Sequence, residues 1–304
     1  MTLHFVTPLV KHYSLSSKYN KNIYLKMDCY QPVMSFKIRG IGYLCEYAKN
    51  QGYTQVASAS GGNAGYATAY AALKLGMKSS VFLPKSADIT TQNKLKELGA
   101  NVIIYGDDIE EASIKAMEFC EKNNVFFIHP FNHPLIWQGH SSIVDELYTQ
   151  IQKPDAIILS VGGGGLLCGI MQGLIKYNWQ DIKVIGSETI GTSSLHQSIK
   201  AKKHLTLDKV SGIATSLGAK KIGDKAFEYV NTYDIQSVVV SDEDSLKACV
   251  EFAYDKKVIV EPACGASLAV IYNNLDVLKD LTNIVVIVCG GINTHLVELK
   301  AKQL

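Results

Sequence analysis

Short apolar runs alternate with amphipathic runs through the first half of the chain, and the two kinds of run have different periods. The strand-like runs cover 54–60, 78–84 and 101–106. The runs in which apolar residues recur with helical spacing cover 63–76, 90–99 and 109–124. A repeated order of strand and helix predicts parallel sheets joined by helical crossovers.

Three later runs are almost continuously apolar, and they cover 156–161, 183–188 and 283–291. Strands that are buried on both faces of a parallel sheet have this pattern, so we expect these runs to be central strands. Gly76 and Gly99 each follow a helical run, and glycine in that position typically ends a helix.

The order of these runs predicts an α/β protein with two open, mainly parallel sheets that carry helices on both faces. We expect residues 40–131 to form a small domain with four strands. This domain is inserted in a larger one, which comprises residues 1–39 and 132–304. The boundary rests on the order of the runs, because the chain has no linker rich in Pro, Ser or Gly and no fixed-period repeat.

Composition favours a soluble protein with a small-molecule partner. The 304 residues carry a net charge of +2, which is too balanced for a nucleic-acid or anionic-membrane surface. The seven cysteines are an odd number without CxxC spacing, which favours a reducing compartment. The N-terminus has no signal-peptide pattern and no apolar run is long enough to cross a bilayer, so we expect a cytoplasmic protein.

The run SVGGGGLLCGIMQGLIKY passes from a strand through four glycines, Gly162 to Gly165, into a helix. Backbone N–H groups at such a helix start bind anions, so this loop predicts a phosphate site. The dinucleotide pattern G-x-G-x-x-G fails in both registers, at Leu167 and at Cys168, and no Gly-Lys-Ser/Thr follows. Glu188, near the position of a ribose-binding acid, keeps a nicotinamide cofactor open.

A second strand, turn and helix occurs in ASASGGNAGYATAY, where Ser60 to Gly65 occupy the turn. The exposed helix start can bind a second anion of carboxylate size. Asn63 adds a side-chain amide that can donate to a phenolate or carbonyl oxygen. The alternative interpretation of this turn is an ordinary helix N-cap.

The third segment is QPVMSFKIRG, in which Lys37 follows Phe36. Alone, Lys37 has the pattern of a solvated surface lysine, and Arg39 that of a structural or surface residue. A lysine beside an apolar ring favours the neutral amine more than an exposed one does, and a Schiff-base lysine needs that form.

Four segments together resemble the fold type II pyridoxal-phosphate enzymes, to which tryptophan synthase β belongs: 35–40, 60–65, 162–165 and 289–291. Within that group the chain is similar to the L-serine dehydratase/L-threonine deaminase family of the mammalian liver type. The shared stretches are PLIWQGHSSIVDEL, LSVGGGGLLCG, VEPACGA and VIVCGG, and the likeness spans the whole chain.

This resemblance implies pyridoxal 5'-phosphate as the cofactor. Lys37 would form the Schiff base, and Phe36 would lie against the pyridine ring. Asn63 would donate to the phenolic oxygen, and Cys289 would face the ring nitrogen. A neutral thiol there makes the cofactor a weaker electron sink, which favours elimination over transamination. The backbone amides that would hold the phosphate belong to Gly162, Gly163, Gly164, Gly165 and Leu166.

The resemblance also implies the reaction. Lys37, once released, would take the Cα proton of serine, hydroxide would leave Cβ with the cofactor phosphate as the acid, and pyruvate and ammonia would form. Threonine would give 2-oxobutanoate. The residues that would bind the substrate are Ser60, Gly61, Gly62, Asn63 and Ala64.

Members of the family bind a potassium-like cation and are homodimers, so we expect both features here. The matching oxygen donors are Glu188, the backbone carbonyls of Thr192, Leu217 and Ala219, and Ser194, and oxygen ligands suit a hard cation. Without the resemblance, Glu188 is equally well interpreted as a solvated acid at a strand end.

Two positions bear on activity. Met34 stands where family members commonly carry glycine, and Gly61 adjoins the expected substrate carboxylate and hydroxyl. The alternatives to a serine/threonine ammonia-lyase are another type II activity, such as serine racemisation or β-replacement by a thiol, and a nicotinamide oxidoreductase. A third is a relative that binds the cofactor without turnover because of Met34.

Overall fold

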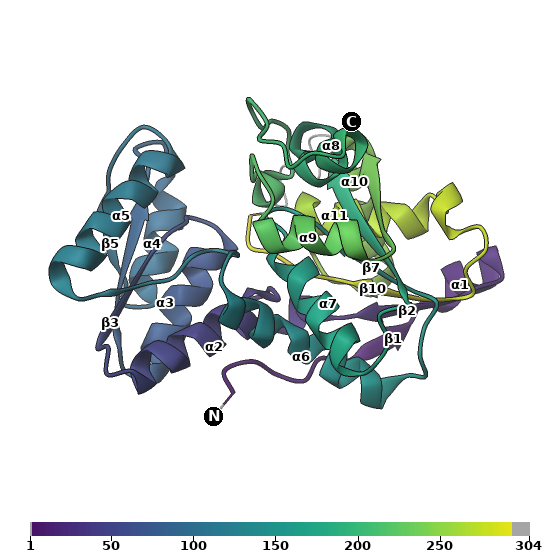
Figure 1. The fold of residues 1–304 in the computed structure, drawn as a ribbon, viewed down its shortest axis with the longest axis horizontal. Helices are drawn as coiled ribbons and strands as arrows, with labels where there is room; N and C mark the ends of the chain where they lie inside the picture. The colour runs from purple at the N-terminus through teal and green to yellow at the C-terminus, as the bar shows by residue number, and fades with distance from the viewer. Residues whose placement is uncertain (1, 294–304) are drawn as a thin grey trace. The chain divides into compact units, whose positions relative to one another are not determined.

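The computed structural model describes residues 2–293, which form two compact units (Figure 1). The smaller unit comprises Met1–Phe5 and Gln31–His140, and the larger unit comprises Val6–Tyr30 and Ser141–Leu304. Residues 31–39 and 132–140, which the sequence patterns place in the larger domain, thus group with the smaller unit. Part of the reason is that helix α2 (Lys37–Asn50) is continuous across position 39.

The smaller unit contains a four-stranded parallel sheet in the order β5-β4-β3-β6. Its strands are β3 (Gln55–Ala59), β4 (Lys78–Leu83), β5 (Asn101–Ile104) and β6 (Phe126–Phe127). Its helices are α2, α3 (Asn63–Leu75), α4 (Ile89–Glu97) and α5 (Ile109–Asn123), and α6 (Pro134–Gln150) begins here and continues into the larger unit.

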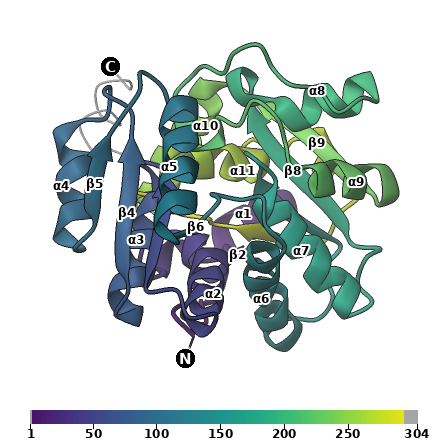
Figure 2. The same ribbon diagram turned by 60° about the vertical axis from the view of Figure 1, so that its left-hand side comes forward.

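Helices cover both faces of this smaller sheet (Figure 2). Side chains alternate between the two faces along β3. Val56 packs in one apolar cluster with α2 and α3, whereas Ala57 and Ala59 pack with Ala112 and Ala116 of α5. The small side chains at the second interface allow α5 to lie close to the sheet.

The larger unit contains a six-stranded sheet in the order β1-β2-β10-β7-β8-β9, in which β1 and β2 are antiparallel and all other pairs are parallel. Its strands are β1 (Leu9–Lys11), β2 (Asn22–Lys26), β7 (Ala156–Ser160), β8 (Lys183–Thr189), β9 (Ile235–Val240) and β10 (Asn283–Ile287). Its further helices are α1 (Tyr13–Tyr19), α7 (Gly165–Lys176), α8 (Ser194–Ala201), α9 (Asp224–Thr232), α10 (Asp242–Lys256) and α11 (Pro262–Tyr272). Short 3₁₀ helices cover Asp28–Tyr30, Ile190–Thr192, Thr215–Leu217 and Asp276–Leu278.

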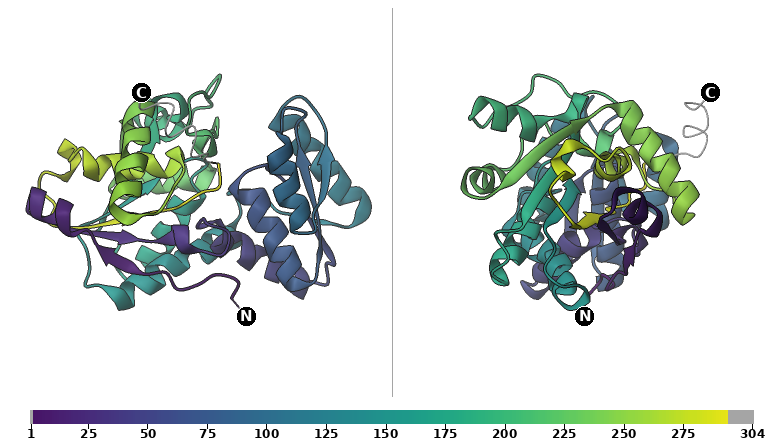
Figure 3. Two further views of the ribbon diagram at one scale, coloured as in Figure 1. Left: turned by 180° about the vertical axis from the view of Figure 1, so that it is seen from behind. Right: turned by 90° about the vertical axis from the view of Figure 1, so that its right-hand side faces the viewer.

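Helices also lie on both faces of the larger sheet (Figure 3). Ser187 Oγ donates to the carbonyl oxygen of Ala266 in α11 at 2.6 Å. Its neighbour Gly186 faces Leu195 of α8, whose Cδ2 would lie 2.8 Å from a Cβ at that glycine. Because consecutive residues of a strand face opposite sides, α8 and α11 cover opposite faces. The predicted fold class is therefore confirmed for both sheets.

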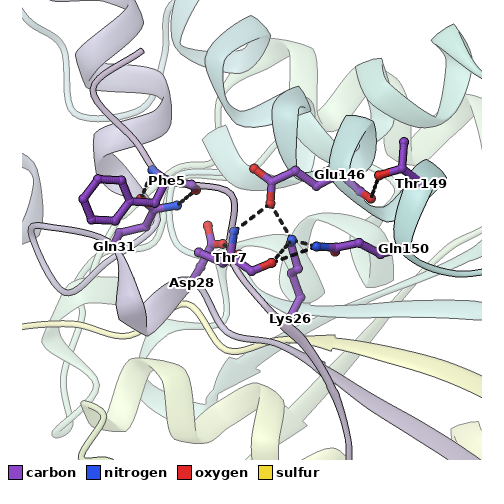
Figure 4. Close-up of polar contacts among 8 residues, drawn as sticks. All are labelled: Phe5, Thr7, Lys26, Asp28, Gln31, Glu146, Thr149 and Gln150. Atoms are coloured by element: carbon purple, nitrogen blue, oxygen red, sulfur yellow. Dashed lines mark hydrogen bonds and ion pairs between the residues drawn. The ribbon is translucent and has the colours of Figure 1, made fainter. Parts of the chain in front are cut away.

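A buried polar network joins β2 to α6 in the larger unit (Figure 4). The Lys26 ammonium donates to the Glu146 carboxylate, to the Thr7 carbonyl at 2.7 Å and to Gln150 Oε1 at 2.9 Å. The Thr7 N–H donates to the same carboxylate at 3.1 Å, and its hydroxyl donates to Asp28 Oδ1 at 2.8 Å. Because these charges are paired and hydrogen-bonded, their burial costs less free energy than the burial of isolated charges would.

The six predicted strands correspond to β3, β4, β5, β7, β8 and β10, and the four predicted helices to α3, α4, α5 and α7. The predicted helix ends are also confirmed, because Gly76 and Gly99 adopt φ values of +67° and +78° just after α3 and α4. Within residues 2–293, no helix combines the length and apolarity that crossing a bilayer requires.

Candidate active site

Lys37 is the first residue of α2, and Phe36 is the residue that precedes the helix. The Lys37 side chain is half-buried, and its Nζ donates to the carbonyl oxygen of Pro130 at 2.6 Å. The surface interpretation of Lys37 is therefore wrong. Arg39 is fully buried, so it is a structural residue rather than a surface one. The Phe36 ring lies 4.9 Å from the ring of His140, centroid to centroid.

The two positions that bear on activity, Met34 and Gly61, are both constrained. Met34 has φ +57° and is 48% exposed, so a methionine occupies the left-handed region in which glycine is favoured. At Gly61, a Cβ atom would lie 3.2 Å from Thr91 Cγ2 and 3.3 Å from Leu83 Cδ2. A larger residue at position 61 therefore requires small shifts of its neighbours.

The turn of residues 60–62 connects β3 to α3 in the smaller unit. Gly62 is the N-cap of α3 and offers no side-chain acceptor, so the ordinary side-chain cap that we considered is absent. Asn63 is the first helical residue and is buried. A Cβ at Gly65 would lie 1.8 Å from the Ser60 carbonyl oxygen, so only glycine permits this tight turn. The helix start can receive an anion.

The glycine loop lies between β7 and α7 in the larger unit. Gly164 adopts φ +87° and precedes the helix, whose first backbone hydrogen bond runs from the Cys168 N–H to the Gly164 carbonyl at 2.9 Å. The N–H groups of 165–167 therefore have no acceptor within the helix. A dianionic phosphate fits this set of donors, because the N–H groups and the helix dipole both favour negative charge.

The close packing of the loop explains two of its glycines. A Cβ at Gly162 would lie 3.1 Å from the Ser216 carbonyl oxygen, and a Cβ at Gly164 would lie 2.6 Å from Ala226 Cβ. The Gly163 carbonyl accepts the N–H of Gly223 at 2.9 Å. The loop is thus held in one shape by its neighbours in the same unit.

Cys289 follows β10 and is buried. A hydrogen bond with Cys264 and the burial of the thiol both raise the pKa of Cys289 well above its usual value, and the Glu261 charge adds to this effect. Cys289 is therefore a neutral thiol near pH 7. This matches the uncharged partner that the resemblance implies for the pyridine nitrogen.

Glu261 is a buried residue that the sequence did not single out. It precedes α11, and its Oε2 accepts the N–H of Asn293 at 3.2 Å. A Cβ at Gly291 would lie 2.0 Å from Glu261 Cδ. Glu261 thus fixes the turn that follows Cys289. The sequence offers one signal for this contact: Glu261 lies in VEPACGA and Gly291 in VIVCGG, and both stretches are shared with the family.

Glu188 is fully buried at the end of β8, so its interpretation as a solvated acid is wrong. Its two carboxylate oxygens accept the N–H groups of Leu195 and His196, each at 2.8 Å. Burial raises the pKa of Glu188 to about 8, although the two N–H donors act in the opposite direction. A nearby cation would favour the ionised form.

The other residues expected to bind a cation supply neutral oxygens. The Ser194 hydroxyl is buried and has no hydrogen-bond partner among the described residues. The Thr192 hydroxyl lies 2.9 Å from that of Thr189, and the Leu217 carbonyl accepts the Ala219 N–H at 2.7 Å. Residues 2–293 contain no cluster of three His, Cys, Asp or Glu that could hold a metal ion. These donors fit a hard monovalent cation better than a transition metal.

Residues 1–290 match a family model described as pyridoxal-phosphate dependent enzyme. An L-serine dehydratase/L-threonine deaminase from Bos taurus is 44% identical over 315 residues, which cover 99% of this chain and 96% of that protein. An L-serine dehydratase from Dictyostelium discoideum is 40% identical, and the match covers 98% of this chain and 91% of that protein.

Two solved structures are similar to this chain over nearly its full length. A fungal L-serine ammonia-lyase from Rhizomucor miehei has a TM-score of 0.93 at 34% identity, and the match covers 100% of this chain and 99% of that one. A maize serine racemase has a TM-score of 0.90 at 27% identity, with 99% and 92% covered.

Proposed function

Because the chain belongs to the family of pyridoxal-phosphate dependent enzymes, we propose that it is an ammonia-lyase that converts L-serine to pyruvate and ammonia. L-Threonine would give 2-oxobutanoate. The observation that carries this proposal is the 44% identity to an L-serine dehydratase/L-threonine deaminase over nearly the full length of both chains. The family match gives no support to a nicotinamide oxidoreductase.

Pyridoxal phosphate, when bound, supplies an electron sink that acidifies the Cα–H bond of an attached amino acid. Lys37 would hold the cofactor covalently, and the N–H groups of 162–166 would hold its phosphate. Phe36 would lie against its ring, and Asn63 would donate to its phenolic oxygen. Cys289 would face the ring nitrogen as a neutral thiol. The geometry of the glycine loop and the raised pKa of Cys289 support these roles.

The turn of 60–64 binds the substrate carboxylate through backbone N–H groups and the Ser60 hydroxyl. The free Lys37 amine would receive the Cα proton of the substrate at Nζ, as the general base of the reaction. The close packing around Gly61 leaves little room for a larger residue beside the bound substrate, and we propose that this position influences the choice between serine and threonine.

In this proposal, a potassium ion would be held by oxygens of Glu188, Thr192, Ser194, Leu217 and Ala219. The buried Ser194 hydroxyl without a partner among residues 2–293 supports an additional ligand at this place. The active protein is a homodimer in the cytoplasm, a part of the proposal that rests on the resemblance and on the composition.

A racemase is the second candidate, because a maize serine racemase has a closely similar structure. Racemisation returns a proton to the opposite face of Cα, whereas elimination expels the Cβ hydroxyl. Incubation of the purified protein with L-serine and potassium separates the two activities. We expect pyruvate as the main product, and D-serine without pyruvate would favour the racemase.

A spectrum tests the cofactor independently of the product. The Schiff base absorbs near roughly 400–430 nm, and Lys37→Ala should abolish this band. A band without turnover of serine, threonine or a thiol acceptor would favour a binding protein that has lost catalysis.

A further inference from the structure

Three consecutive residues, His129, Pro130 and Phe131, form a turn after β6 in the smaller unit, and we name it the 129–131 turn. It lies 93 positions from Lys37 in sequence, yet its Pro130 carbonyl accepts a hydrogen bond from Lys37 Nζ at 2.6 Å. A short bond of this kind fixes the direction of the amine.

His129 holds the turn in shape. Its Nδ1 accepts the N–H of Asn132 at 2.8 Å and the N–H of Phe131 at 3.2 Å. A ring nitrogen that accepts hydrogen bonds carries no proton, so the proton of the neutral ring resides on Nε2. The ring also packs edge-on against Phe131, with the centroids 4.8 Å apart.

The imidazole remains neutral in these surroundings. Burial, the Lys37 charge and His133 lower the pKa of His129 to about 4. Protonation of Nδ1 would remove the acceptor of both backbone N–H groups, so the turn requires the neutral ring. A neutral ring also avoids a second positive charge beside Lys37.

We propose that His129 is a positioning residue, which orients the Lys37 amine through the Pro130 carbonyl whenever that amine is not bound to the cofactor. The inference rests on the proposed function. An amine that donates one N–H to a fixed carbonyl has its lone pair confined to the remaining directions. The Cα proton is then taken by an amine already oriented, which lowers the entropic cost of proton transfer.

Two substitutions separate the turn from the imidazole. An asparagine side chain accepts the N–H two residues ahead, so His129→Asn keeps the turn and removes the ring. His129→Ala removes both. His129→Asn is therefore the conservative variant against which His129→Ala is compared.

For His129→Ala we expect kcat for L-serine to fall by roughly 10–100-fold, since small displacements of a catalytic group cost this much. KM should change little, and the kinetic isotope effect with α-deuterated serine should rise. When pyridoxal phosphate is added to the apoprotein, in which the Lys37 amine is free, the band near roughly 400–430 nm should form more slowly than in the parent protein. His129→Asn should resemble the parent protein in these kinetic and spectroscopic measurements.

Equal losses in the asparagine and alanine variants would overturn the proposal, because they would assign the effect to the imidazole itself. An alanine variant identical to the parent protein would overturn it as well. If alanine does not fold, His129→Leu keeps the buried volume and also lacks the acceptor. If the parent protein forms no pyruvate but the band still forms more slowly in His129→Ala than in the parent protein, the proposed function fails while the positioning of Lys37 stands.

Discussion

Gly291 and Glu261 are in such close contact that a Cβ on Gly291 would lie 2.0 Å from the carboxylate carbon. Gly291 also has φ +131°, which side chains rarely adopt. The carboxylate therefore occupies the space of the missing side chain. This contact fixes the chain just after Cys289.

Gly291→Ala should destabilise the protein by roughly 2–4 kcal/mol, because overpacking adds to backbone strain. The turn beyond Cys289 should also move and weaken cofactor binding. Gly52→Ala is the control, since Gly52 has φ +88° with no atom near its absent Cβ, and it should cost about 1 kcal/mol. Urea unfolding measures both variants, and equal losses would contradict the role of the contact.

Met34→Gly should raise the free energy of unfolding by roughly 0.5–1 kcal/mol, because glycine adopts a φ of +57° without strain. Asn20→Gly is the control, because asparagine tolerates its left-handed φ of +52° better than methionine does. It should gain less. Thermal unfolding of both variants checks this order, and a loss of stability in Met34→Gly would disprove the strain.

Lys26→Met should cost roughly 3–5 kcal/mol, because it leaves the buried Glu146 carboxylate without its ammonium partner. The double variant Lys26→Met/Glu146→Leu should recover most of this loss. Lys153→Met, which breaks an exposed pair with Asp181, should cost less than about 1 kcal/mol. A double variant as unstable as the single one would show that the other bonds of the network dominate.

Glu188→Gln should remove the response of thermal stability to potassium, since the only carboxylate among the proposed ligands is lost. It should also cost about 1–2 kcal/mol, because the amide nitrogen cannot accept one of the two backbone N–H groups at α8. Melting temperatures in potassium and in tetramethylammonium chloride test this. A variant that still responds to potassium would place the cation elsewhere.

Stability should fall as pH drops below about 6.5, the ordinary pKa of histidine. Burial lowers the pKa values of His129 and His140, the former to about 4. As the pH falls, these two imidazoles therefore become protonated in the unfolded chain before they do in the folded protein. The contribution of His129 is complete above pH 6.5 and lost toward pH 4; it amounts to at most about 3 kcal/mol, reduced by solvent screening. His129→Asn should flatten the pH dependence of urea unfolding, and an unchanged slope would contradict the assignment.

The sequence predicts those features that have a local pattern. The apolar runs at 156–161 and 283–291 predict central strands, and the glycines of 162–165 predict the turn between β7 and α7. Strand β1 has three residues, which is too short for a period to be visible. The role of Glu261 depends on Asn293, 32 positions away, and that of His129 depends on a bond between Lys37 and Pro130, which are 93 positions apart. No local pattern records such contacts.

The order of strands in the larger sheet has a consequence for synthesis on the ribosome. Strand β10 lies between β2 and β7, yet it is the last strand to be made. At about 5–20 residues per second, Asn283 is added roughly 13–50 s after Lys26. Before Asn283 is added, all strands of the smaller unit have been made. In the larger sheet, however, no hydrogen-bonded strand yet connects the antiparallel pair β1 and β2 to β7. A nascent chain that stops before residue 283 therefore carries two unconnected pieces of sheet with exposed edges, which are targets for chaperones or aggregation.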